Sequence, residues 1–440
     1  MNGNDHRARN VPVAGRRLAG APVARRGILS AVLAVLALFC STAGADAQQR
    51  MFEKRTTHYH VATDISPQFT NVVAAHMEEI FKEYSRRFKG YGTVDKRFEV
   101  AVFGTEAAYL RRFPQVQGSA GVFISRLRTL AAHADGRTTE EVLRTLYHEG
   151  FHQFMWEVIS KDCPIWLNEG IAEYFHSATW NGHSFSTGQV PTKRAIILTQ
   201  MLKQTGHIPF EQLFAMDDRQ WLNNVRANPR MAMIQYVESW SIVHFLLHAQ
   251  RGRYNPMLIN YLKAIDAGKD SREAFTAVFG QDMASFERAW RQYAASLKPS
   301  PKYVCRDNMA SILMLALSYY GNPQRLTSVE KLREEAVDSG QYRWRVVQPS
   351  GRVISSTDED AAAGLFSCPP GSRRKGTNYL LVRDPATNLP VLVCMQHKGI
   401  VIKAYYVRNP DGSYGARTEE VVRELVPDGM KRAITAASRD

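Results

Sequence analysis

Several features are missing from this sequence of 440 residues. Beyond the first 47 residues, no apolar run approaches the ~20 residues that a membrane-spanning helix needs. There is no internal repeat and no nucleic-acid-binding motif, so we expect no nucleic-acid partner. The composition, 45% hydrophobic and 22% charged, excludes wholesale disorder, and the length leaves room for two or three domains.

The one long apolar run belongs to an expected signal peptide over residues 1–47. Six arginines form a basic region, Ile28–Phe39 form the apolar segment, and Ala45-Asp46-Ala47 offers a cleavage site. We therefore expect the mature protein to be exported and soluble, in the periplasm or secreted. The pair Arg25-Arg26 loosely matches a twin-arginine signal, which leaves the export route open. Phe39 before Cys40 argues against a lipoprotein, whose lipobox has a small residue there.

Export would change the charge of the chain. The leader carries six arginines and two aspartates, so its removal lowers the formal net charge from +14 to +10. The basic residues are mostly scattered along the chain, which favours a solvated basic surface. Contact with an anionic envelope surface is the alternative. Oligomeric state is not predicted.

Four cysteines would remain in the mature protein: Cys163, Cys305, Cys368 and Cys394. Cysteines of exported proteins commonly form disulfides. Cys368 and Cys394 share a strand-rich region and are the preferred pair, although the sequence does not fix the connectivity.

Hydrophobic periodicity predicts an α+β fold in three parts. Residues 48–137 form a small α/β part with a mixed sheet, residues 138–298 are helical, and residues 303–440 form a separate C-terminal α+β or β-rich module. Lys298–Lys302, with two prolines, is the expected linker. The expected elements of the first part are strands at 58–62, 97–103 and 121–130 and a helix at 68–88.

Hydrophobic periodicity also predicts the helices and strands of the two later parts. In the helical part we expect helices at 138–155, 166–175, 194–203, 231–249, 256–265, 271–279 and 283–297. In the C-terminal module we expect helices at 308–320 and 328–336 and strands at 342–348, 352–355, 379–382, 391–394 and 400–407. The C-terminal module carries no recognisable chemical motif, and its role is not predicted.

The pattern that points to chemistry is His148-Glu149-Gly150-Phe151-His152. Histidines four residues apart on a helix lie about 40° from each other around its axis, so both imidazoles can bind one metal ion. Glu149, between them, can reach a water at that ion. Thr138 followed by Glu141 is a capping-box pattern, which starts the helix that this spacing requires.

A catalytic zinc ion usually has three protein ligands and a water. The candidates for the third ligand are Glu157, Asp162, Glu169, Glu173 and His176. Glu157 follows too soon on the same helix, and Asp162 lies in the turn. Glu169 lies on the next helix, and Glu173 shares its face. We favour Glu169 as the ligand and Glu173 as the hydrogen-bond partner of a ligand histidine. The exchange of these two roles stays open.

These residues resemble a known family. His148-Glu149-Gly-Phe-His152 followed by Trp166-Leu-Asn-Glu169-Gly-Ile-Ala-Glu-Tyr174 is similar to the gluzincin metallopeptidases, the thermolysin and aminopeptidase N group. Closer still is the peptidase-MA-like family of bacterial exported proteins, largely catalogued as a domain of unknown function. The resemblance covers about residues 57–297. It implies a zincin-like metallopeptidase domain over 48–298, with Zn²⁺ held by His148, His152 and Glu169.

The resemblance also implies further roles. The strand around Val122–Leu130 would be the edge on which an extended substrate pairs. Gluzincins stabilise the oxyanion with a Tyr or His well downstream, which maps to Tyr236, with His244 as the alternative. Tyr236 fits a core position on an amphipathic helix equally well. The Gly-x-Met-x-Asn motif of the aminopeptidases is absent, which counts against that activity and leaves the substrate open.

The sequence therefore predicts an exported zinc-dependent hydrolase that cleaves peptide bonds in a peptide or protein substrate. Glu149 would be the general base and Tyr236 the oxyanion donor. The alternative is a zinc-binding, catalytically inactive envelope-associated binding or scaffold protein. A third reading is hydrolysis of a non-peptide amide or of cell-wall peptide.

Overall fold

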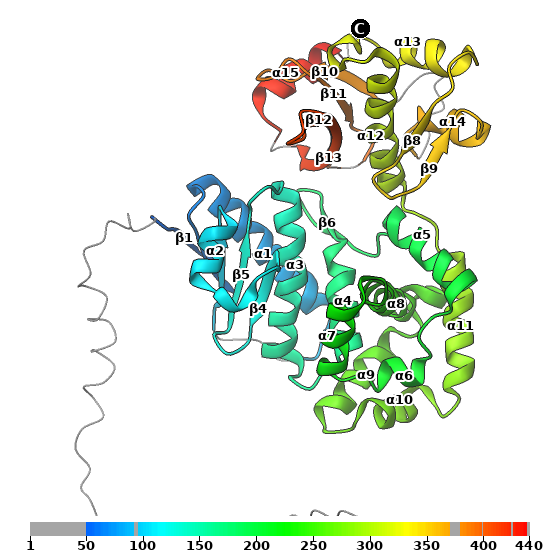
Figure 1. The fold of residues 1–440 in the computed structure, drawn as a ribbon. Helices are drawn as coiled ribbons and strands as arrows, with labels where there is room; N and C mark the ends of the chain where they lie inside the picture. Colours follow the sequence, from blue (N-terminus) through cyan, green and yellow to red (C-terminus); the bar gives the residue numbers. More distant parts are fainter. Residues whose placement is uncertain (1–49, 92–95, 370–378, 398, 424–425, 438–440) are drawn as a thin grey trace, which may run out of the picture. The chain divides into compact units, whose positions relative to one another are not determined.

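The computed structural model describes residues 50–440 except 92–95, 370–378, 398, 424–425 and 438–440 (Figure 1). The expected signal peptide, residues 1–47, lies outside the described residues. The described chain has a mixed α+β fold, as predicted: a small N-terminal sheet, a central helical region and a C-terminal antiparallel sheet. None of the helices in these ranges is both long and apolar enough to cross a bilayer.

The N-terminal part is a five-stranded mixed sheet with two helices. The strand order is β1-β2-β3-β5-β4, in which β2, β3 and β5 are parallel and the two edge strands are antiparallel to their neighbours. The expected mixed sheet is confirmed, whereas β1 and α2 were not predicted. The elements are β1 (Phe52–Arg55), β2 (Tyr59–Thr63), α1 (Pro67–Arg87), β3 (Phe98–Phe103), α2 (Glu106–Arg112), β4 (Gly121–Ile124) and β5 (Thr129–His133).

The single strand predicted at 121–130 is wrong. The segment is a hairpin in which β4 turns back and pairs with β5, with Phe123 opposite Leu130. Arg128 adopts a φ of 54° in the turn, so this position reverses the chain without a glycine or proline. As a result only β4 lies at the edge of the sheet, and β5 is an interior strand.

The helix with the histidine pair, α3 (Thr139–Phe154), begins as the sequence predicts. The Thr138 side chain accepts from the Glu141 N–H and the Glu141 side chain accepts from the Thr138 N–H, which completes the capping box. A wider turn at Met155–Ile159 ends the helix, and α4 (Ile165–His176) starts directly after Pro164. The two helices pack against each other, which brings their polar faces together.

The remaining helices of this region pack around α8 (Figure 1). The longest of its helices, α8, packs along α4, and large buried aromatic side chains fill the space between the helices. A two-stranded hairpin, β6 and β7, precedes these helices. The bounds are β6 (Thr179–Trp180), β7 (Phe185–Ser186), α5 (Thr192–Gln200), α6 (Phe210–Phe214), α7 (Asp218–Ala227), α8 (Pro229–His248), α9 (Asn255–Asp266), α10 (Ser271–Phe279) and α11 (Met283–Ser296).

The C-terminal module has a four-stranded antiparallel sheet, β10-β11-β12-β13, and a small hairpin of β8 and β9. The strand β13 and the helices α14 and α15 were not predicted. The elements are α12 (Pro301–Tyr320), α13 (Val329–Arg333), β8 (Arg345–Val347), β9 (Val353–Ser355), α14 (Glu359–Leu365), β10 (Leu380–Arg383), β11 (Pro390–Cys394), β12 (Ile400–Arg408), β13 (Tyr414–Val422) and α15 (Asp428–Ala437).

The connection to this module is shorter than the expected linker Lys298–Lys302. Helix α12 already begins at Pro301, because proline fits the first turn of a helix. The Ser300 N–H donates to the Val190 carbonyl at 2.9 Å, which attaches the connection to the helical region. The connection also separates the hydrophobic cores. One cluster of buried side chains runs from Tyr59 to Ala294, and two other clusters lie between Cys305 and Ile434.

The cysteine pairing differs from the preferred one. Cys305 and Cys368 form a disulfide, with their Cα atoms 4.6 Å apart. The predicted pair Cys368–Cys394 is wrong, because α12 carries Cys305 to Cys368 from a position distant in the sequence. The Cys394 sulfur lies next to this disulfide, 3.2 Å from that of Cys368.

Candidate metal centre

The two histidines of α3 face each other across one small space. The Nε2 atoms of His148 and His152 are 3.1 Å apart, and each side chain is 13% exposed. Two unprotonated ring nitrogens at this distance repel each other through their lone pairs, unless a proton or a cation lies between them. The two nitrogens can therefore share a proton or bind one cation in this space.

Glu169 of α4 completes a triangle of ligand atoms. Its Oε2 lies 3.4 Å from His148 Nε2 and 3.6 Å from His152 Nε2. Zinc bonds of 2.0–2.2 Å in tetrahedral geometry place ligand atoms about 3.3–3.5 Å apart, close to the three observed edges. The same Oε2 is buried and accepts no hydrogen bond in the described chain, which leaves it free to bind a cation. The donor set fits zinc.

The other candidates for the third ligand lie elsewhere. Glu157 forms an ion pair with Arg128. The ring of His176 lies 6.1 Å from that of His148, outside the group of atoms that could hold an ion, and Asp162 is also outside that group. Glu173 approaches the other nitrogen of His148 and not the shared space. Of the five candidates, the structure brings only Glu169 into the triangle.

Contacts on the outer side of the rings fix their orientation. His152 Nδ1 donates to Asn168 Oδ1 at 2.9 Å, so its Nε2 is left as the atom that faces the metal position. Glu173 Oε1 lies 3.5 Å from His148 Nδ1, which is longer than an ordinary hydrogen bond. Arg194 forms an ion pair with the Glu173 carboxylate and donates to its main-chain carbonyl. Glu173 thus holds a position between His148 and the buried guanidinium of Arg194.

Glu149 lies where α3 meets the edge of the N-terminal sheet. Its Oε2 accepts from the Phe123 N–H of β4 at 2.9 Å. In an antiparallel pair, the N–H and C=O of one residue point to the same side. Since the Phe123 N–H points away from β5 to Glu149, its C=O also points out of the sheet edge. The carboxylate and one edge strand therefore meet directly.

The charges of the site favour a cation. Burial opposes ionisation of Glu169, yet the two imidazoles hold its pKa well below the usual range. Burial also opposes protonation of His152, but Glu169 and Glu149 outweigh it and raise the pKa to about 9. Burial raises the pKa of Glu149, and the histidines offset only part of that rise. The site is a buried, negatively polarised space into which a positive charge fits.

Tyr236 and His244, the two predicted oxyanion residues, differ in their surroundings. Tyr236 is partly buried in the first half of α8, and its ring lies edge-to-face against that of Trp221 with the ring centroids 5.3 Å apart. Burial, together with the charges of Glu169 and Glu149, raises its pKa, so the hydroxyl stays protonated. Both nitrogens of His244 are already engaged: Nδ1 with the Tyr293 hydroxyl at 2.7 Å and Nε2 with the Gly188 carbonyl at 3.1 Å.

Two glycines let the helices of the site approach closely. A Cβ on Gly150 would lie 2.9 Å from the Met77 methyl group of α1, so glycine here lets α3 pack on α1. A Cβ on Gly170 would lie 2.6 Å from the Ser239 carbonyl oxygen, so glycine lets α4 lie against α8. Both glycines are next to a site carboxylate in the sequence.

The C-terminal module reaches the same helix through a buried charge network. Glu420 of β13 binds Arg144 of α3 at 3.0 Å, Arg306 at 2.7 Å and Lys302 at 3.2 Å. Arg306 also binds Glu140, and the Glu420 N–H donates to Glu140 Oε2 at 2.7 Å. Burial opposes ionisation of Glu420, but the three cations hold its pKa well below the usual range. Arg144 lies one helical turn before His148.

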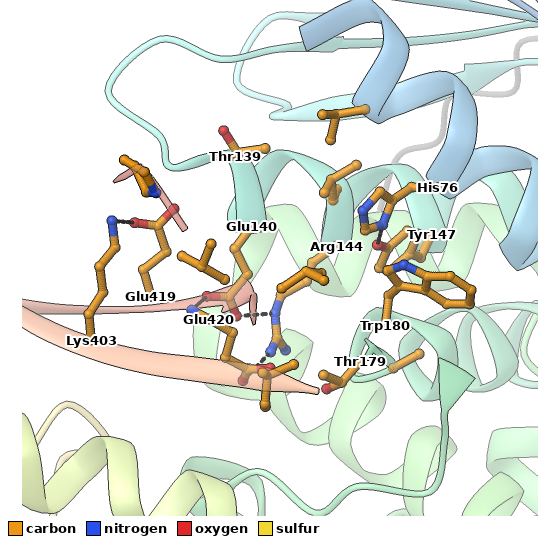
Figure 2. Close-up of a pocket in the computed structure, with 17 residues that line it drawn as sticks. His76, Thr139, Glu140, Arg144, Tyr147, Thr179, Trp180, Lys403, Glu419 and Glu420 are labelled. Carbon is orange, nitrogen blue, oxygen red and sulfur yellow. Dashed lines mark hydrogen bonds and ion pairs between the residues drawn. The ribbon is translucent and has the colours of Figure 1, made fainter. Parts of the chain in front are cut away.

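A cavity of about 300 Å³ lies beside this network (Figure 2). Figure 2 shows Arg144 and Glu140 of α3 facing Glu420 on one side, and His76 against Tyr147 on the other. The remaining wall comes from Thr179 and Trp180 of β6 and from β12 and β13. The three candidate ligands do not line it, so this cavity and the metal centre are separate spaces on one helix.

Sequence reasoning missed three parts of this site. Asn168 stands directly before Glu169, but only the packing of α4 on α3 shows that it reaches His152. Arg194 is distant in sequence from Glu173, and no spacing rule links them. Glu420 belongs to a strand whose residues are all partly buried, so it carries no periodic signal.

A family described as "Protein of unknown function (DUF1570)" matches residues 142–265, the segment from α3 to α9 that contains the whole triangle. No curated protein matches the chain.

Proposed function

We propose that the protein is an exported zinc-dependent metallopeptidase-like hydrolase. One observation carries this proposal: His148, His152 and Glu169 converge on one space, with the Glu149 carboxylate held beside them at a sheet edge. The proposal places the protein in the periplasm or outside the cell, with a peptide or protein as its substrate. It assigns the chain to gluzincin-type chemistry.

The site residues would have two separate roles in the proposed reaction, metal binding and proton transfer. Zinc at His148, His152 and Glu169 would supply a Lewis acid that polarises a carbonyl and lowers the pKa of water to about 7. Glu149 accepts the proton of the attacking water and passes it to the leaving amine. The raised pKa of Glu149 suits this exchange, because a stronger base takes up the proton more readily.

The sheet edge supplies a place for the substrate. An extended peptide can add to β4 through main-chain hydrogen bonds, and Phe123 directs its C=O outward at the right position. Such a peptide would pass directly over Glu149. This role belongs to β4 alone, because β5 is paired on both sides.

Tyr236 supports the tetrahedral oxyanion in this proposal. Its hydroxyl remains protonated at neutral pH, so it is a hydrogen-bond donor near the two site carboxylates. His244 is the weaker candidate, since hydrogen bonds occupy both of its nitrogens.

The test compares Glu149→Gln with a control variant, Glu79→Gln, which changes a half-buried carboxylate of α1 that pairs with Lys82. Zinc content is measured by elemental analysis, and cleavage of a peptide library is measured with and without a chelator. We expect Glu149→Gln to keep its zinc and to lose turnover by at least a hundredfold, the scale of lost general-base catalysis. We expect the control to keep both.

Two results would count against the proposal. Unchanged hydrolysis by Glu149→Gln would remove the assigned base. Bound zinc without any chelator-sensitive cleavage in the unaltered protein would favour the inactive envelope-associated binding or scaffold protein. Cleavage limited to cell-wall peptides or to non-peptide amides would redirect the substrate class while the mechanism stands.

A further inference from the structure

Three cysteines and a histidine meet in the C-terminal module, away from the metal centre of α3. Cys305 lies in α12, Cys368 follows α14, Cys394 ends β11, and His397 lies in the turn after it. One ligand atom from each, three Sγ and one ring nitrogen, lies within 4.8 Å of every other. The three cysteines are fully buried, and His397 is partly buried.

The contacts within this cluster centre on Cys368. It forms the disulfide with Cys305, the Cys394 sulfur lies 3.2 Å from it, and His397 Nε2 lies 3.4 Å from it. A disulfide needs only two of these groups. The convergence of a third sulfur and an imidazole nitrogen on the same point is therefore unexplained by the disulfide.

We propose that Cys305, Cys368, Cys394 and His397 form a second zinc site, which is available when a dithiol reductant opens the Cys305–Cys368 disulfide. The site is independent of the proposed peptidase chemistry. It would be structural, since four protein ligands leave no open position on a tetrahedral zinc ion.

The donor set and its spacing fit this ion. Three sulfurs and one imidazole are a known structural zinc set, with Zn–S bonds near 2.3 Å. Tetrahedral bonds of that length place sulfurs about 3.8 Å apart. The His397–Cys368 distance of 3.4 Å is close to such an edge, whereas the Cys394–Cys368 distance of 3.2 Å is about 0.6 Å shorter. Both the Cys394 sulfur and the Cys305 sulfur therefore need to move away from Cys368 when zinc binds.

Disulfide reduction precedes zinc binding in this proposal. The reductant gives two electrons and two protons to the Cys305–Cys368 bond, which yields two thiols, and the reductant closes its own disulfide. Zinc then displaces three protons, one from each thiol, and takes the neutral nitrogen of His397 as its fourth ligand. Both forms join α12 to the segment after α14, one through a disulfide and the other through the ion.

Simple thiol–disulfide exchange fits the geometry less well. Attack of Cys394 on Cys368 would need the three sulfurs in line, with Cys394 about 5.2 Å from Cys305 for an ordinary S–S bond of about 2.05 Å. The cluster is more compact than that, because all of its ligand atoms lie within 4.8 Å.

The test measures zinc per chain in oxidised protein and in protein reduced with a dithiol and then exposed to zinc. We expect one more bound ion in the reduced protein. Cobalt in place of zinc should give a thiolate-to-metal charge-transfer absorption. His397→Ala and Cys394→Ser should abolish the additional ion, whereas Cys163→Ser, a cysteine outside the cluster, should keep it.

The second zinc site can be tested separately from the metal centre on α3 by counting the additional ion. It should persist in a His148→Ala/His152→Ala variant, so its presence does not depend on the proposed function. The proposal is overturned if reduced, folded protein binds no additional ion, or if His397→Ala and Cys394→Ser bind it as well as the unaltered chain. It is also overturned if the Cys305–Cys368 disulfide only exchanges to Cys368–Cys394 with release of the Cys305 thiol, or if reduction unfolds the module and zinc does not restore its circular dichroism.

Discussion

Gly170→Ala tests whether the contact between α4 and α8 positions Glu169. The added methyl carbon would lie 2.6 Å from the Ser239 carbonyl oxygen and 2.9 Å from a methyl carbon of Val243. Ordinary contacts begin at 3.4 Å, and the nearer atom belongs to the backbone. The side chain of residue 170 therefore cannot be accommodated by a rotamer change alone, and the helices must separate by roughly 0.8 Å, the amount that restores ordinary contact.

Two opposing effects set the magnitude. Overpacking of a tight interior contact costs about 1–3 kcal/mol. Alanine recovers up to about 1 kcal/mol relative to glycine in a helix. We expect a net loss of stability of about 1–2 kcal/mol. Because metal–ligand distances tolerate only about 0.2 Å, the displacement of Glu169 should weaken zinc binding by about tenfold or more.

The measurements are the thermal midpoint of the metal-free protein and the zinc affinity by competition with a chelator. Gly364→Ala is the matched control, because this helical glycine of α14 has open space at its Cβ position. We expect the control to be neutral or slightly stabilising, with unchanged zinc affinity. A Gly170→Ala protein that is as stable as the parent and binds zinc equally well would refute the reasoning, as would an equal loss in the control.

Three other predictions follow from single contacts. Asn168→Ala removes the hydrogen bond to His152 and should weaken zinc binding about 10- to 100-fold, measured by chelator competition. His244, whose pKa burial lowers from about 6.5 to about 4, contributes stability that is full above pH 6.5 and is lost as the pH falls towards 4. His244→Gln should flatten that fall by up to about 3 kcal/mol in unfolding measured at several pH values, and an unchanged slope would contradict the assignment. Thr138→Ala should cost about 0.5–2 kcal/mol of stability through the lost helix cap, and no loss would show that the cap is dispensable.

Local patterns in the sequence were enough to predict much of the fold. The helix α1 and the helix α10 have strong apolar periodicity, and their bounds agree with the prediction within a residue. The capping box at Thr138 depends only on neighbours along the chain, so it too could be predicted. The β4–β5 hairpin could not, because Arg128 turns the chain without the glycine, proline or asparagine that usually marks a turn.

In the candidate site, too, local patterns could be predicted from the sequence and contacts between separate elements could not. The His148–His152 pair follows from helix geometry, so the sequence alone predicts that both rings face one space. The partners that orient the rings depend on how separate helices pack, and no spacing rule fixes that packing. Glu420 is the clearest case. A buried carboxylate without a partner would destabilise the fold, and three cationic side chains that lie far from Glu420 in the sequence compensate its charge.

The position of Arg144 has a consequence for how two neighbouring turns of α3 affect each other. Arg144 lines the cavity beside the C-terminal module, and His148 is one turn further along the same helix. A molecule that bound in that cavity would compete with Glu420 for Arg144, and any resulting shift of the α3 backbone would also displace His148. Thermodynamic linkage then requires that occupation of either space change the affinity of the other by the same factor.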